Sequence, residues 1–156
     1  MLDKQQILDS LLSEGEIVKH LIQKLPDGAA DYRPTPEQRS ALELLRYLAM
    51  CGIGGTLAMA DGNWDGYKAW SAKTAELPLD EIAPAIDRQA DALREFYGAL
   101  TDEQFANQKA TTPMGQEMSL GRALLELPVK WMTAYRMQLF LYCKQAGNAD
   151  IWTPNC

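Results

Sequence analysis

The chain has 156 residues, of which 47% are apolar, a length and composition typical of one globular domain and unlike those of a disordered chain. Fifteen Lys and Arg against 21 Asp and Glu give a formal net charge of −6, so we do not expect nucleic-acid binding. No apolar run approaches the roughly 20 residues needed to span a bilayer, and no secretory signal is visible. These features predict a cytoplasmic protein without a membrane partner.

The first helix is predicted over residues 2–25, where leucine, isoleucine and valine recur at steps of three and four residues. The breakers at 26–28, Pro-Asp-Gly, end it. A second helix is predicted to begin at Thr35, because Pro36 suits the first helical position and Gln38 completes a Thr-x-x-Gln capping box.

The second helix is expected to continue to the Asp-Gly-Asn sequence at 61–63. Gly52, Gly54 and Gly55 weaken it, each by about 1 kcal/mol relative to alanine, unless close packing against another helix requires them. The stretch 61–78 is expected to be a connection with at most a short helical turn.

A third long helix is predicted over 79–100, and Pro84 is tolerated because it lies in or near the first turn. Residues 101–104, Thr-Asp-Glu-Gln, repeat the capping-box pattern and predict a short helical piece. The polar stretch 107–117 is expected to be a loop, or at most a small hairpin.

The last helix is predicted over 119–146, capped by the serine at its start and ended by Gly147. Pro128 lies well inside it, which predicts a kink near 124–128. Four long helices without a convincing strand predict an all-α protein, an antiparallel four-helix bundle with extra helical turns in its connections. We expect a single domain over 1–156.

Metal ligands are scarce in this sequence. The chain has one histidine, His20, beside the apolar stripe of the first helix, and we expect it to be exposed or hydrogen-bonded at the surface. A site built from several histidines is therefore excluded by count. A site built only from carboxylates requires inward-facing acids, and Glu43 and Glu126 are the candidates, although neither has the Glu-x-x-His partner of di-iron bundles.

The cysteines do not form a recognisable metal or redox motif. Cys51, Cys143 and Cys156 are widely spaced, and no CxxC pair exists. Cys51 and Cys143 lie in apolar stretches, so we expect both to be buried and to behave as small hydrophobic residues.

One short string resembles the opening of a calcium-binding loop. Residues 61–66 read Asp-Gly-Asn-Trp-Asp-Gly, which matches the start of an EF-hand loop. The twelfth position, which supplies a bidentate glutamate in an EF-hand, is Ala72. The same composition is typical of a turn, and we predict a turn.

An aromatic row on the last predicted helix is the remaining signal. Trp131 and Tyr135 are four residues apart and share one face, and Tyr47 meets them if the second and last helices face each other. Arg136 and Gln138 lie beside this row. These aromatic residues either fill the core or line a cavity, since Tyr and Trp carry polar tips that need partners when buried.

Two segments resemble the DinB-like superfamily: SALELLRYLA at 40–49 and AYRMQLFLYCKQAG at 134–147. The length of the first helix, the Tyr-Arg-Pro sequence at 32–34 and the tail at 151–155 are also similar to that family. The resemblance implies a four-helix bundle, commonly homodimeric, that holds a divalent metal on three histidines. It also implies a relation to metal-dependent thiol transferases and isomerases.

Carried over position by position, the family's histidine on the second helix falls on Tyr47, and its paired histidines fall on Trp131 and Tyr135. Arg136 and Gln138 keep the family's pattern. Trp cannot ligate a metal, and two neutral phenols make a poor site for a divalent cation. The resemblance therefore implies a divergent member that lacks the metal-binding histidine triad and needs no cofactor.

Three functions remain open from the sequence. The leading hypothesis is a protein that binds a small molecule in a cavity bordered by Tyr47, Trp131 and Tyr135. The first alternative is an enzyme of the same fold that uses other residues, such as carboxylates around a metal. The second is a homodimeric interaction protein in which the aromatic row is only core.

Overall fold

The computed structural model describes residues 3–152, and over that range the protein is mostly helical. The single sheet among these residues is a two-stranded antiparallel hairpin. In chain order the α-helices and strands are α1 (Lys4–Ile22), α2 (Ala41–Asp61), α3 (Asp65–Thr74), α4 (Ile82–Ala99), α5 (Asp102–Asn107), β1 (Lys109–Thr111), β2 (Glu117–Ser119), α6 (Leu120–Leu124) and α7 (Lys130–Gln145). A π-helical turn, Leu125–Val129, joins α6 to α7, and 3₁₀ turns occupy Ala29–Asp31 and Leu79–Glu81.

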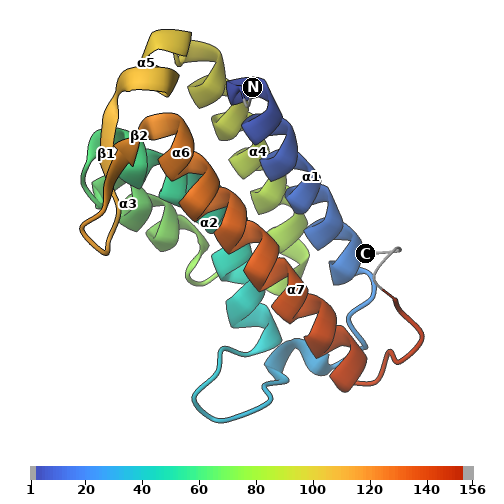
Figure 1. Cartoon of the computed structure of the whole chain (residues 1–156). Coiled ribbons are helices and arrows are strands. Elements are labelled where there is room, and N and C mark those ends of the chain that lie inside the picture. The colour runs from blue at the N-terminus through green and yellow to red at the C-terminus, as the bar shows by residue number, and fades with distance from the viewer. Residues whose placement is uncertain (1–2, 153–156) are drawn as a thin grey trace.

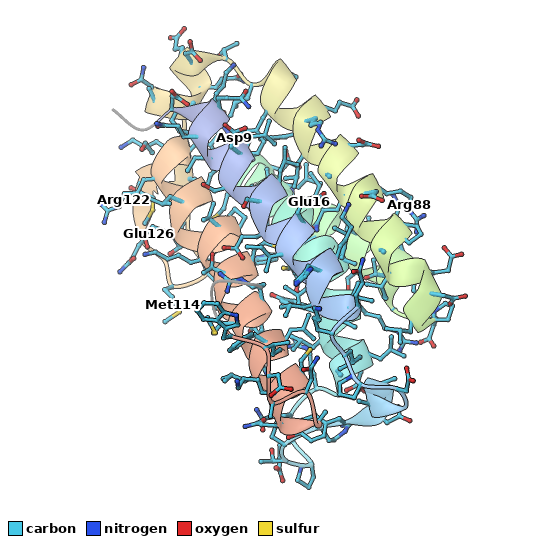
Figure 2. The ribbon with its side chains drawn as sticks, turned by 90° about the vertical axis from the view of Figure 1, so that its right-hand side faces the viewer. Asp9, Glu16, Arg88, Met114, Arg122 and Glu126 are labelled. Atoms are coloured by element: carbon cyan, nitrogen blue, oxygen red, sulfur yellow. The ribbon has the colours of Figure 1, made fainter. Side chains whose placement is uncertain are left out.

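Four long segments pack side by side (Figure 1). Helix α1 contacts α4 and α7, and α2 also contacts α4 and α7, so that the apolar faces of all of them meet in one core. In Figure 2, α1 lies between α7 on one side and α4 on the other. Helix α3 packs on α2, and the β1–β2 hairpin and α5 close one end of the assembly.

Helix α2 begins later than the sequence pattern predicted. Its first residue is Ala41, and its cap is Ser40, whose side chain accepts a hydrogen bond from the backbone nitrogen of Glu43. The Glu43 carboxylate accepts in return from the Ser40 backbone nitrogen at 2.7 Å, which completes a capping box. The predicted cap at Thr35 forms only a turn, closed by a hydrogen bond from the nitrogen of Gln38 to the Thr35 carbonyl.

The connection after α2 is more helical than predicted. Gly62 has a φ of 67° and ends α2 in the left-handed conformation that favours glycine. The Asn63 side chain then accepts from the Asp65 nitrogen at 2.9 Å, and α3 follows with 10 residues where only a short turn was expected. Within the segment 61–66, where a turn was predicted, residues 62–64 form the turn, and the residues on either side belong to α2 and α3.

The elements after α4 follow the predicted order. Thr101 and Gln104 form the predicted capping box of α5, and β1 pairs with β2 in the register Lys109 to Ser119. Ser119 occupies the N-cap position of α6, but its side chain makes no capping hydrogen bond, contrary to the prediction. Pro128 has no N–H to donate, and the turn that contains it is π-helical.

Helix α2 is the core helix of the protein. Within residues 3–152 it is the one helix long and apolar enough to span a membrane by composition alone, yet 72% of its apolar window is buried inside the protein. Its glycines serve close packing: a Cβ on Gly55 would lie 3.3 Å from the Trp131 ring and from Pro128. Cys51 and Cys143 are buried and free, as predicted, whereas Cys156 lies outside the described residues.

The single histidine is more enclosed than the sequence predicted. His20 is half-buried near the end of α1, and its Nε2 atom is buried without a hydrogen-bond partner among residues 3–152. The expectation of an exposed or hydrogen-bonded surface histidine was wrong for this nitrogen, which is neither exposed nor hydrogen-bonded.

Candidate functional site

The helices α2 and α7 bring Tyr47 and Tyr135 into direct contact. Their ring centroids are 4.7 Å apart and their planes are inclined by 69°, which is an edge-to-face arrangement. Both side chains are half-buried. The sequence made a meeting of Tyr47 with the aromatic row conditional on facing helices, and in the structure Tyr47 meets Tyr135.

Arg39 completes this contact, and sequence reasoning missed it. Its guanidinium carbon lies 4.4 Å from the centroid of the Tyr47 ring and 5.6 Å from that of Tyr135. A guanidinium over aromatic faces is a cation–π interaction, which is stronger when the groups are partly desolvated. Arg39 directly precedes the Ser40 cap, so its place is fixed by the true start of α2, which the sequence pattern had put several residues earlier.

The groups around Tyr47 are held in their neutral forms. Burial raises the pKa of the Tyr47 hydroxyl well above its ordinary value, and the neighbouring Cys51, Tyr67 and Tyr135 groups raise it further. Burial also raises the pKa of the Cys51 thiol, whose sulfur lies 3.3 Å from the sulfur of Met132. At neutral pH this region therefore offers a phenol and a thiol, and neither a phenolate nor a thiolate.

Trp131 belongs to the same aromatic cluster through Trp64, which directly precedes α3, and through Tyr67 of α3. Its ring stacks on Trp64 with a centroid distance of 6.4 Å and an angle of 24°, and Trp64 meets the edge of Tyr67 at 5.2 Å. We call Tyr47, Trp64, Tyr67, Trp131 and Tyr135 the aromatic cluster. No sequence signal identified Trp64 and Tyr67 as its members, because α3 was not predicted as a helix.

The other two predicted site residues make contacts elsewhere. Arg136 forms a salt bridge with Glu14 of α1, with Nε 2.8 Å from Oε2. Thr133 donates a hydrogen bond to the same carboxylate at 2.8 Å. Gln138 donates to the hydroxyl of Tyr142 at 2.7 Å. The structure thus joins three of the five predicted residues in one cluster, uses Arg136 to tie α7 to α1, and leaves Gln138 in a hydrogen bond within α7.

A cavity of about 380 Å³ adjoins the aromatic cluster at Trp131. We call it the Trp131 cavity. It lies between the hairpin and the π-helical turn, and its apolar wall includes Pro113, Met118 and Leu127. Met114, which is 86% exposed, borders it from the hairpin turn. The remaining lining residues are Thr112, Gln116, Arg122 and Glu126.

The Trp131 cavity is lined by one cation, Arg122, and one carboxylate, Glu126. Glu126 pairs with Lys130 through a hydrogen bond, which is the main reason that the pKa of the Glu126 carboxyl is below its ordinary value. The positive charges of Lys130 and Arg122 lower this pKa further. Arg122 is exposed and forms no salt bridge within the described part of the chain. Figure 2 shows Arg122 and Glu126 along one edge of the molecule, with Met114 beyond them.

The chemistry of the aromatic cluster does not fit a divalent metal. Tyr47 is a neutral phenol, Trp131 has no lone pair to donate, and the Arg39 guanidinium adds a positive charge over the tyrosine rings. Glu43, a candidate for a carboxylate site, is exposed and engaged in its capping box and with Arg33 at 3.3 Å. Between residues 3 and 152, no three His, Cys, Asp or Glu side chains are grouped so that they could hold a metal ion.

These observations define the class as a mostly helical protein with a cluster of aromatic residues between α2, α3 and α7. The sequence profile of the DinB family matches residues 1–155, and the chain belongs to the DinB family. The uncharacterised protein YjoA of Bacillus subtilis (strain 168) is 24% identical over 152 residues, which cover 97% of this chain and 96% of YjoA.

Two crystal structures share the fold. The DinB-like protein YjoA from Bacillus subtilis superposes with a TM-score of 0.71 at 20% identity, covering 95% of this chain and 96% of YjoA. A DinB-type protein from Exiguobacterium sibiricum 255-15 gives a TM-score of 0.66 at 22% identity, covering 100% of this chain and 99% of that one. At these identities the likeness concerns the fold.

Proposed function

We propose that this DinB-family protein is a metal-free binding protein that holds a small apolar anion in the Trp131 cavity. In this proposal the four long segments form the DinB-type four-helix bundle, kinked at Pro128. The three positions of the family's metal site are then occupied by Tyr47, Trp131 and Tyr135. The observation that carries the proposal is that Trp131 borders both the aromatic cluster and a cavity lined by Arg122, a cation that forms no salt bridge among the described residues.

The shape of the site favours a compact ligand. A volume of about 380 Å³ lies at the lower end of the range of about 300–1,000 Å³ typical of small-molecule sites. The indole of Trp131 and the side chains of Met118 and Leu127 supply apolar contact, and Arg122 supplies a charge-assisted hydrogen bond for a carboxylate or sulfonate. The ligand predicted by this chemistry has an apolar body and one anionic group.

The proposal that the protein binds no metal ion is tested by metal analysis of protein purified without a histidine tag. Elemental analysis after expression in medium supplemented with zinc, nickel and manganese is expected to give far less than one metal ion per chain. A stoichiometric transition metal that dialysis does not remove would contradict the proposal and favour an enzyme that uses other ligands.

Binding is tested with 1-anilinonaphthalene-8-sulfonate, an apolar sulfonate whose fluorescence rises in an apolar site. Trp131→Ala is expected to weaken its binding at least about tenfold, because both the indole contact and one wall are lost. Trp152→Ala is the matched control, since Trp152 is 61% exposed and does not line the cavity. Circular dichroism melts establish that each variant is folded.

A second pair of variants isolates the charge. Arg122→Gln is expected to weaken binding about two- to fivefold at low salt, in the range of an exposed ion pair. Arg88→Gln removes an equal charge from α4, on the opposite side of the view in Figure 2, and is expected to leave binding unchanged. Equal effects of both substitutions would show that only net charge matters, which contradicts a specific site.

Localisation and oligomeric state are the remaining parts of the proposal. We propose that the protein is a cytoplasmic homodimer, and light scattering of the purified chain checks its mass. A monomer at micromolar concentration would remove the dimeric interaction protein from consideration without affecting the Trp131 cavity.

A further inference from the structure

A second and larger cavity lies away from the Trp131 cavity and shares no lining residue with it. Its volume is about 590 Å³, it is open to solvent, and it is bordered by the last turns of α2, by α4 and by α5, with Trp70 of α3 also in its wall. We infer that this cavity binds an organic ammonium ion, a small molecule with an aromatic or aliphatic body and one protonated amine. We call it the α2–α4 cavity.

The wall of the α2–α4 cavity suits an apolar body. Ile53 and Leu57 of α2 and Phe96 of α4 line it together with Trp70. Leu120, which is fully buried, lies at its base. Its volume is in the middle of the range of about 300–1,000 Å³ for small-molecule sites, so a single-ring ligand with a short side chain fits.

The charges at the α2–α4 cavity are negative and uncompensated. Asp61 and Glu95 both line it, and neither forms a salt bridge or side-chain hydrogen bond with another residue of the described chain. Asp61 is the last residue of α2, where the carbonyl groups of the helix end add a partial negative charge. No Lys or Arg is among the lining residues, although two amines contact the wall: that of Lys73 lies over the Trp70 ring and that of Lys4 donates to the Leu100 carbonyl.

The aromatic walls add to the preference for a cation. Trp70 already attracts one: the Lys73 amine lies 4.6 Å from the centroid of its ring. Tryptophan is the aromatic residue that binds cations best, and such a contact strengthens when water is excluded. Two free carboxylates, a helix C-terminus and aromatic rings around one apolar space are together complementary to an ammonium group on an apolar body.

The two glutamine side chains that line the α2–α4 cavity already form hydrogen bonds within the protein. Gln108 lines the cavity and donates a hydrogen bond from Nε2 to the carbonyl of Ala60 at 2.8 Å. Gln104 lies in the capping box of α5, where its Oε1 accepts from the backbone nitrogen of Thr101 at 3.0 Å. The carboxylates of Asp61 and Glu95 are therefore the charged acceptors that remain for a ligand, beside the neutral Oε1 of Gln108.

The test uses 2-phenylethylamine as the probe and 2-phenylethanol as its uncharged counterpart, with binding followed by calorimetry at pH 7 and low salt. The amine is expected to bind saturably at millimolar or lower concentration and at least about tenfold more tightly than the alcohol. Raising the salt concentration to 0.5 M is expected to weaken the binding of the amine and to leave that of the alcohol unchanged.

Variants locate the site. Glu95→Gln and Asp61→Asn are each expected to weaken binding of the amine about two- to fivefold, and together by about the product of the two effects. Trp70→Ala is expected to weaken binding of both probes, because it removes apolar wall. Glu103→Gln is the control, an equal change of charge on α5 at an exposed residue that does not line the cavity.

Two results would overturn the inference. One is equal affinity for the amine and the alcohol, which would show that the carboxylates do not contribute. The other is an equal loss of affinity in Glu103→Gln and Glu95→Gln, which would show attraction by net negative charge alone. The double variant Glu95→Gln with Asp61→Asn keeps the test decisive if Trp70→Ala does not fold, since both carboxylates are exposed and far less important to the core.

Discussion

The side-chain amide of Gln89 on α4 lies directly against the backbone of Gly52 on α2. Its Oε1 accepts hydrogen bonds from the Gly52 nitrogen at 2.9 Å and the Ile53 nitrogen at 3.2 Å, and its Nε2 donates to the Leu48 carbonyl at 3.0 Å. Gln89 is 1% exposed, so these are buried bonds between two helices. The missing side chain at Gly52 is what allows the amide to approach so closely.

Gln89→Leu is expected to lower the free energy of unfolding by about 1–3 kcal/mol. The buried backbone groups of α2 lose the partners that Gln89 provides, while the volume of the side chain changes little. Urea denaturation measures the change. Faster hydrogen exchange at the amides of Gly52 and Ile53, compared with the rest of α2, is the local signature. Unchanged stability would show that the α2 backbone satisfies these groups without Gln89.

Gly52→Ala is expected to destabilise the protein by about 1 kcal/mol although alanine favours a helix. Its Cβ would lie 3.1 Å from Oε1 of Gln89 and 3.5 Å from Met132, so the amide must move. Gly98→Ala is the matched control near the end of α4, where a new Cβ meets nothing within 4 Å. That control is expected to stabilise by about 0.5–1 kcal/mol in thermal or urea melts.

The salt bridge between Glu14 and Arg136 is expected to contribute measurably to stability. The two side chains are 13% and 12% exposed, so the ion pair is shielded from solvent. A double-mutant cycle with Glu14→Gln and Arg136→Met is expected to give a coupling free energy of about 1–3 kcal/mol. The corresponding cycle for Asp91 and Arg94, which are 80% and 55% exposed, is expected to give less than about 0.5 kcal/mol.

Stability at high pH is expected to depend on Tyr47. Burial raises the pKa of its hydroxyl in the folded protein, while in the unfolded chain it titrates near 10.0. The stabilisation of the neutral phenol is therefore fully present below pH 10 and is lost as the pH rises above it, because the unfolded chain then releases a proton that the folded chain keeps. The loss is smaller than the roughly 1.4 kcal/mol per pH unit of a fully buried phenol, since Tyr47 is half-buried.

Tyr47→Phe is the variant that checks this dependence. Urea melts at pH 9 and pH 11 are expected to show a smaller fall in the free energy of unfolding than in the unsubstituted protein. Tyr32→Phe, at a tyrosine outside the aromatic cluster whose hydroxyl bonds Gln145 at 3.2 Å, is the control and is expected to leave the fall unchanged. The same fall in Tyr47→Phe as in the original chain would mean that another group is responsible.

The sequence by itself determined the helical class, the order of the long elements and several of their ends. Periodic apolar residues, breakers and caps are local signals, so α1, α4 and the α5 capping box fell close to where they were predicted, whereas the stretch 107–117 was expected to be a loop or at most a small hairpin. The contact between Tyr47 and Tyr135 was also within reach, because each lies on a long periodic helix and the family pattern pairs the two positions.

Only the tertiary structure decided which residues share a site. The place of Arg39 depends on the true start of α2, and that of Trp64 and Tyr67 on an unpredicted helix and the residue before it. The place of Gln89 depends on a glycine of the neighbouring helix. Arg136 continues the aromatic row in sequence, yet it pairs with Glu14, because adjacent positions on a helix point about 100° apart. Both cavities likewise arise between elements, since packing across helices has no local pattern from which it can be read.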